Sequence, residues 1–139
     1  MRRVAALALV AAGLVAVSTA AARPTVETEG RAQYVAWCGA CHAVDANGVG
    51  PMDRDLVGRP VAALTRYRYS AALRRLGEGL LPLGEAWSPE RLDQWLRDPQ
   101  AMAPGSSMTT TVADPAVRRA IITYLATVSD TAPNPVFEK

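Results

Sequence analysis

Residues 38–42 place two thiols and an imidazole within one short stretch, in the order Cys38-Gly39-Ala40-Cys41-His42. A Cys-x-x-Cys-His run is typical of covalent haem attachment, in which the thiols form thioethers with the haem vinyl groups and the histidine ligates the iron. The sequence has no other Cys and no other His. It therefore predicts one haem c, held by Cys38 and Cys41, with His42 as its histidine ligand.

Other functions of the same residues are less consistent with the sequence. A structural zinc site normally needs more Cys or His ligands than this chain has. A redox-active Cys-x-x-Cys of the thioredoxin kind is expected within a strand–helix–strand pattern, which the flanking residues do not show. A plain disulfide between Cys38 and Cys41 stays open as an alternative.

Haem iron has two axial positions, so the ligand opposite His42 must be another side chain, a small molecule or water. The candidate side chains are Met52, Met102, Met108 and, more remotely, Lys139. Met108 is preferred because it ends a turn-forming stretch, Pro104-Gly105-Ser106-Ser107, that lets the backbone fold back across the haem. Ordinary core packing is the alternative for each methionine.

A methionine ligand has a direct chemical consequence. A thioether favours ferrous over ferric iron, so a His/Met pair raises the reduction potential. Two strong axial ligands also leave no open coordination position on the iron. The pair therefore predicts electron transfer and not oxygen or peroxide chemistry.

The elements that must position these groups are helices. Apolar spacing and start signals predict helices over 30–41, 70–76, 88–98 and 114–128, the second stopping near Gly77, with a turn-rich loop at 45–51. The haem motif then lies at the C-terminal end of the first helix. No alternating strand pattern of useful length is present, which predicts an all-α domain whose long loops wrap around a cofactor.

The N-terminal residues read as an export signal. Arg2 and Arg3 precede an apolar run over 4–17, and Ala20-Ala21-Ala22 fits a cleavage site before Arg23. The run is shorter than the ~20 residues that span a bilayer, so a retained anchor is the less favoured alternative. The predicted organisation is a signal peptide (1–22), a flexible leader (23–29), a haem domain (30–128) and a loose tail (129–139), in a protein exported to the periplasm.

Charge gives little indication of a partner. The whole chain carries a formal charge of +2, and loss of Arg2 and Arg3 with the signal peptide would bring it to zero. The basic isoelectric point therefore describes the uncleaved chain. It does not favour nucleic acid or an acidic membrane surface.

In combination, the motifs resemble those of class I cytochromes c, close to the mitochondrial and bacterial c2 type, from about Gly30 to Leu125. Beyond the haem motif, the resemblance rests on Gly50-Pro51, Leu56-Val57-Gly58-Arg59, Tyr67-Arg68-Tyr69-Ser70, Trp87, Asp98-Pro99, Pro104-Gly105-Ser106-Ser107-Met108 and Tyr124-Leu125. It implies the cytochrome c fold, one covalent haem c and axial ligation by His42 and Met108.

The resemblance also implies roles for residues around the haem. The carbonyl of Pro51 would accept a hydrogen bond from the His42 ring, the support that a metal-bound imidazole generally has. Arg59, Tyr69 and Trp87 would hydrogen-bond the haem propionates, with core packing as the alternative for Tyr69 and Trp87. Finally, Gly30 and Tyr34 would meet Ile121 and Tyr124 where the first and last helices cross.

This chain departs from the family pattern in two places. Asp53 and Asp55 stand where leucine and glycine are common, so we expect a loop of different shape, with Met52 available to fill the vacated apolar space. The ring of lysines around the haem edge of the mitochondrial type is replaced by Trp37, Gln100, Ala101 and Ser107. Docking through such a ring is therefore not expected here.

These observations predict an exported monohaem electron carrier that is not an enzyme and shuttles single electrons between redox proteins, such as a cytochrome complex, an oxidase or a periplasmic dehydrogenase. An alternative is a dedicated haem c subunit, tightly bound to the catalytic subunit of a periplasmic oxidoreductase. A third possibility is a haem enzyme or gas sensor in which Met108 does not bind the iron.

Overall fold

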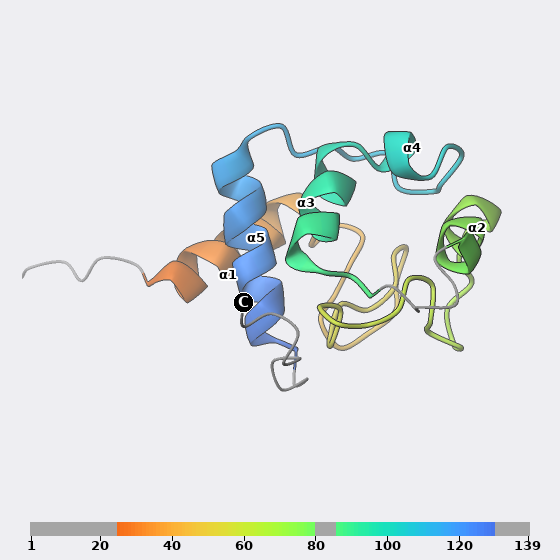
Figure 1. Cartoon of the computed structure of the whole chain (residues 1–139). Coiled ribbons are helices and arrows are strands. Elements are labelled where there is room, and N and C mark those ends of the chain that lie inside the picture. Colours follow the sequence, from red (N-terminus) through yellow and green to blue (C-terminus); the bar gives the residue numbers. More distant parts are fainter. Residues whose placement is uncertain (1–24, 80–85, 130–139) are drawn as a thin grey trace, which may run out of the picture.

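The computed structural model describes residues 25–79 and 86–129, which form helices joined by long loops (Figure 1). The helices are α1 (Val26–Trp37), α2 (Ala71–Gly79), α3 (Pro89–Arg97), α4 (Pro99–Met102) and α5 (Pro115–Thr127). Within these ranges Pro60 and Ala86 form an isolated β-bridge, and no strand is formed. The predicted all-α fold is confirmed. No helix within the described ranges combines the length and apolar character needed to cross a bilayer.

The helices begin where short polar side chains satisfy free backbone N–H groups. Ser88 Oγ accepts a hydrogen bond from the Arg91 N–H at 3.2 Å, and Asp114 accepts one from the Ala116 N–H at 2.7 Å. Each cap is followed by a proline, whose fixed φ suits the first helical position and whose missing N–H costs nothing there. The predicted starts of α3 and α5 are thus confirmed.

Three boundaries differ from the prediction. Helix α1 begins at Val26, capped by Thr25, so residues 26–29 of the expected flexible leader are helical. Helix α2 continues through Gly77 to Gly79, because Gly77 serves a close contact instead of a stop: a Cβ there would lie 2.7 Å from the Val61 carbonyl oxygen. The short helix α4 was not predicted. The proposed signal peptide and residues 130–139 of the predicted tail lie outside the described residues.

Helices α1 and α5 cross closely, as Figure 1 shows. The crossing requires a residue without a side chain at Gly30, where a Cβ would lie 2.5 Å from the Ala120 carbonyl oxygen and 2.9 Å from Tyr124 Cβ. One turn further along, the rings of Tyr34 and Tyr124 pack with centroids 5.2 Å apart. The predicted meeting of the first and last helices is confirmed, and it fixes the position at which α1 delivers the haem motif.

A buried arginine on α5 ties the C-terminal part of the chain together. Arg118 is 6% exposed, and its Nε lies 2.7 Å from an Asp93 carboxylate oxygen on α3. The same guanidinium donates to the carbonyls of Val112 and Ala113 at 2.9 and 2.8 Å. Val112 and Ala113 belong to the loop between α4 and α5, so Arg118 holds that loop against both helices. No motif or spacing in the sequence indicates this role for Arg118.

Candidate functional site

One cavity collects all the residues that the sequence assigned to a haem site. Its lining includes Cys38, Cys41, His42, Pro51, Arg59, Tyr69, Trp87 and Met108. These residues come from the end of α1, from the loops on either side of α2 and from the loop after α4. Apolar side chains of α3 and α5 complete the wall, among them Leu92, Leu96 and Ile121. An apolar cavity with a few polar groups suits a large hydrophobic cofactor.

The two cysteines follow directly from the end of α1. Cys38 caps the helix, and its N–H donates a hydrogen bond to the Tyr34 carbonyl at 2.8 Å. In the turn that follows, the N–H groups of Cys41 and His42 donate hydrogen bonds to the Cys38 carbonyl at 3.0 and 2.9 Å. Both cysteines are free thiols. Burial, helped by the nearby Asp53 carboxylate, raises the pKa of Cys38 to about 12. Cys38 therefore offers a protonated thiol, while Cys41 is exposed.

The His42 ring is held in the orientation that a metal ligand needs. Its Nδ1 lies 2.9 Å from the Pro51 carbonyl oxygen, the contact that the family resemblance implies. A carbonyl only accepts hydrogen bonds, so Nδ1 carries the proton and the Nε2 lone pair is available for iron. Gly50 makes room for the ring, because a Cβ there would lie 2.4 to 2.6 Å from three ring atoms.

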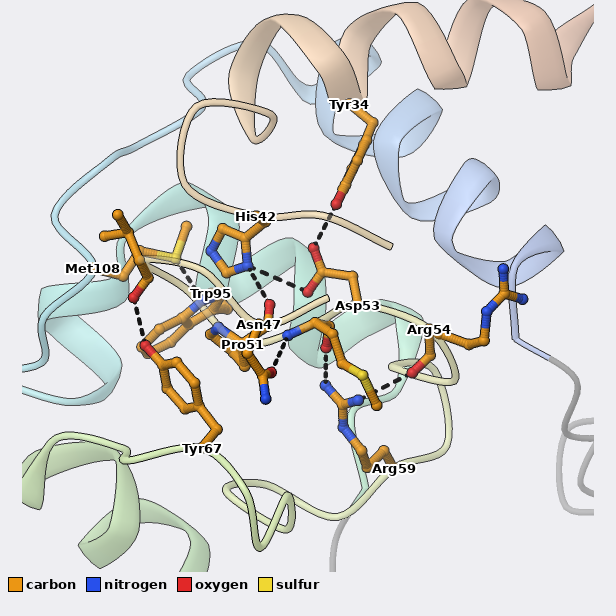
Figure 2. A network of polar contacts seen from close by, with 12 residues as sticks. Tyr34, His42, Asn47, Pro51, Asp53, Arg54, Arg59, Tyr67, Trp95 and Met108 are labelled. Atoms are coloured by element: carbon orange, nitrogen blue, oxygen red, sulfur yellow. Dashed lines mark hydrogen bonds and ion pairs between the residues drawn. The ribbon is translucent and has the colours of Figure 1, made fainter. Parts of the chain in front are cut away.

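A carboxylate lies beside the same ring nitrogen. Asp53 is 5% exposed; its Oδ2 accepts a hydrogen bond from the Tyr34 hydroxyl at 3.0 Å, and its Oδ1 lies 3.4 Å from His42 Nδ1 (Figure 2). Burial, reinforced by Asp53, raises the pKa of Tyr34 well above its usual range. Burial by itself lowers the pKa of His42, but Asp53 and the Pro51 carbonyl together outweigh it, and the net pKa is raised.

The loop that carries Asp53 differs from the expectation. Met52 does not fill the space left by the missing leucine; the Asp53 side chain turns inward instead, because Tyr34 supplies a buried donor for it. Asp55 adopts the left-handed conformation, with φ of 58°, that is usual for glycine and tolerated by aspartate. No sequence pattern indicates the Tyr34–Asp53 contact, since these residues meet only through the fold.

Arg59 provides a test of whether the cavity fits haem c. Its guanidinium donates to the carbonyls of Arg54 and Met52, each at 3.0 Å, while its Nε is buried without a partner in the described part of the chain. A buried N–H without an acceptor is costly. A haem propionate would supply both an acceptor and the opposite charge. The cationic side chain, the free thiols and the available His42 Nε2 therefore fit haem c.

Met108 is the one methionine among the three described candidates that lines the cavity. Its sulfur accepts a hydrogen bond from the Trp95 indole N–H at 3.1 Å. The loop around it is held by Gln100, whose amide donates to the Ser106 and Met108 carbonyls at 3.0 and 2.8 Å. Met108 thus has a defined place on the same cavity as His42. Trp95 was predicted only as part of a helix stripe, so its contact with sulfur was missed.

Comparisons with known proteins identify the family of the chain. Residues 27–129 match the family model for cytochrome c. The chain is 36% identical over 101 residues to cytochrome c-type cyt cy of Rhodobacter capsulatus, and 34% identical over 103 residues to cytochrome c2 of Afifella marina. These matches cover 71% and 70% of this chain, and 47% and 80% of the two relatives. The chain thus spans about half the length of the first relative.

A solved structure gives the same result for the fold. Cytochrome cH from Methylobacterium extorquens superimposes with a TM-score of 0.62 at 34% sequence identity, over 71% of this chain and 95% of that one. The chain therefore belongs to the cytochrome c family and binds one covalent haem c.

Proposed function

We propose that this protein is an exported electron carrier in which His42 and Met108 are the two axial ligands of a single haem iron, as the site geometry and the c2-type relatives suggest. The observation that carries the proposal is that an imidazole with its Nε2 available and a thioether line the same apolar cavity. Bound haem c supplies a one-electron Fe(II)/Fe(III) couple. Cytochromes c are electron carriers and not enzymes.

The chain's own residues would tune and protect this couple. Pro51 fixes the His42 ring, and the Trp95 N–H draws electron density from the Met108 sulfur. The aromatic and aliphatic wall excludes water, which disfavours the more highly charged ferric state. Arg59, Tyr69 and Trp87 are proposed to bind the propionates. Export to the periplasm, predicted from residues 1–22, would place the carrier among other redox proteins.

A potentiometric titration of the purified holoprotein tests the carrier role. We expect a single one-electron transition, and no carbon monoxide binding by the ferrous protein, because both axial positions are filled. Rapid carbon monoxide binding would instead favour the haem enzyme or sensor. Purification from native cells distinguishes a free carrier from a dedicated haem subunit. Stable copurification with a larger catalytic subunit would favour the haem subunit.

The exposed residues that line the cavity form its rim, and their lack of charge predicts how the carrier docks with redox partners. Among the described lining residues, those that are exposed are uncharged: Trp37, Cys41, Val49, Ser107, Thr109 and Thr110. Two of them are apolar, with Trp37 44% and Val49 78% exposed. A rim of this kind provides contact area without long-range electrostatic steering.

We therefore expect electron self-exchange to depend weakly on salt. Its rate, measured by NMR line broadening in mixed ferrous and ferric samples, should change by less than about threefold as the Debye length falls from about 30 Å to about 8 Å. The variant Ser107→Lys, which adds one charge to the rim, should show a clearly steeper dependence. Strong salt dependence in the unmodified protein would contradict docking through an uncharged rim.

A further inference from the structure

The pair Tyr34 and Asp53 is the feature of this site that haem attachment does not explain. Neither residue is in the haem motif, yet Asp53 lies beside Nδ1 of His42, the ring nitrogen other than the Nε2 that is available for iron, and Tyr34 reaches Asp53 (Figure 2). The backbone also holds Asp53 in place, because the Asp53 N–H donates a hydrogen bond to the Ala43 carbonyl at 3.1 Å. Its carboxylate thus has one firm donor, Tyr34, and one close neighbour, the N–H of His42.

Two acceptor groups therefore lie beside the one N–H of His42. The Pro51 carbonyl, at 2.9 Å from Nδ1, makes the shorter contact, and Asp53 Oδ1, at 3.4 Å, adds a negative charge. A carboxylate beside a metal-bound imidazole raises the basicity of that ligand. It also stabilises the more positive of two metal states through simple electrostatics, and burial weakens the screening. Both effects favour ferric iron.

We propose that Asp53 is a positioning residue for His42, and that its carboxylate, held by Tyr34, lowers the reduction potential of the haem iron below the value that the Pro51 carbonyl alone would give. The inference rests on His42 ligation within the proposed function. It does not depend on Met108 or on any partner protein. Asp53 would then offset part of the rise in potential that a thioether ligand and an apolar cavity produce.

The holoprotein with Asp53→Asn tests this inference, since the substitution keeps the shape of the side chain and removes its charge. We expect the electron equilibrium to shift about tenfold or more toward Fe(II), which corresponds to a rise of about 59 mV for a one-electron couple. The hyperfine-shifted NMR resonances of the His42 ring should move as well. A control, Asp45→Asn, removes an exposed carboxylate that pairs with Arg54 and should give a much smaller shift.

The variant Tyr34→Phe provides an opposite expectation. It leaves the charge of Asp53 but removes its hydrogen-bond donor, so the carboxylate interacts more strongly with His42 and the potential should fall. If Tyr34 and Asp53 had only a structural role, both substitutions would shift the reduction potential in the same direction. The inference is overturned if Asp53→Asn shifts the potential no more than Asp45→Asn, or lowers it. If Asp53→Asn yields no holoprotein, an unchanged or raised potential in Tyr34→Phe overturns it. A one-electron titration of the unmodified protein tests the carrier role independently.

Discussion

Replacing Met108 with alanine will lower the reduction potential by on the order of a tenth of a volt or more, within the roughly 0.8 V range that axial ligands span. The thioether stabilises ferrous iron, and alanine offers no replacement ligand. The vacated position should also bind carbon monoxide in the ferrous protein. Potentiometry and the near-infrared sulfur-to-iron band of the ferric protein measure the effect, and the band should disappear.

Met102→Ala is the matched control for this prediction. Met102 packs against the hydrophobic core but does not line the cavity. Its loss should leave the near-infrared band in place and cost mainly stability, about 2 to 3 kcal/mol for a half-buried methionine. Should Met108→Ala keep the band and the potential of the unmodified protein, the ligand opposite His42 has been assigned to the wrong side chain.

Replacing Arg118 with methionine should lower the free energy of unfolding by about 2 to 4 kcal/mol. The substitution keeps much of the apolar stem but leaves the carbonyls of Val112 and Ala113 without their donor. It also leaves Asp93 without its cation, although that side chain is 38% exposed and water compensates part of the loss. Guanidinium unfolding of the ferric holoprotein measures the change.

The same substitution should also weaken the site, because Arg118 anchors the loop that leads away from Met108. We expect carbon monoxide to bind faster to the ferrous variant than to the unmodified protein. The neighbouring Arg119→Met is the control, since Arg119 is exposed, and it should change stability by no more than about 0.5 kcal/mol. A loss below about 1 kcal/mol for Arg118→Met would show that water replaces its contacts.

The sequence alone determined those features whose physics is local. Ser88-Pro89 and Asp114-Pro115 begin helices because a side-chain oxygen and a proline satisfy the first turn, whatever lies elsewhere in the chain. The haem motif specifies its own chemistry because its groups are adjacent. The pattern that resembles cytochromes c placed the remaining site residues, and the structure brings them to one cavity.

Only the tertiary structure decided the features that depend on residues distant in the chain. Gly77 looked like a helix stop, but its role is set by the carbonyl of Val61 against which α2 packs. Asp53 was expected only to change the shape of its loop, and it is buried because Tyr34 from α1 supplies its hydrogen bond. Arg118 is buried because two hydrogen-bond acceptors surround its guanidinium, the Asp93 carboxylate on α3 and the Val112 carbonyl in the loop between α4 and α5. A polar group can be buried without a large cost only where hydrogen-bond or charge partners surround it, and the tertiary fold determines where those partners lie.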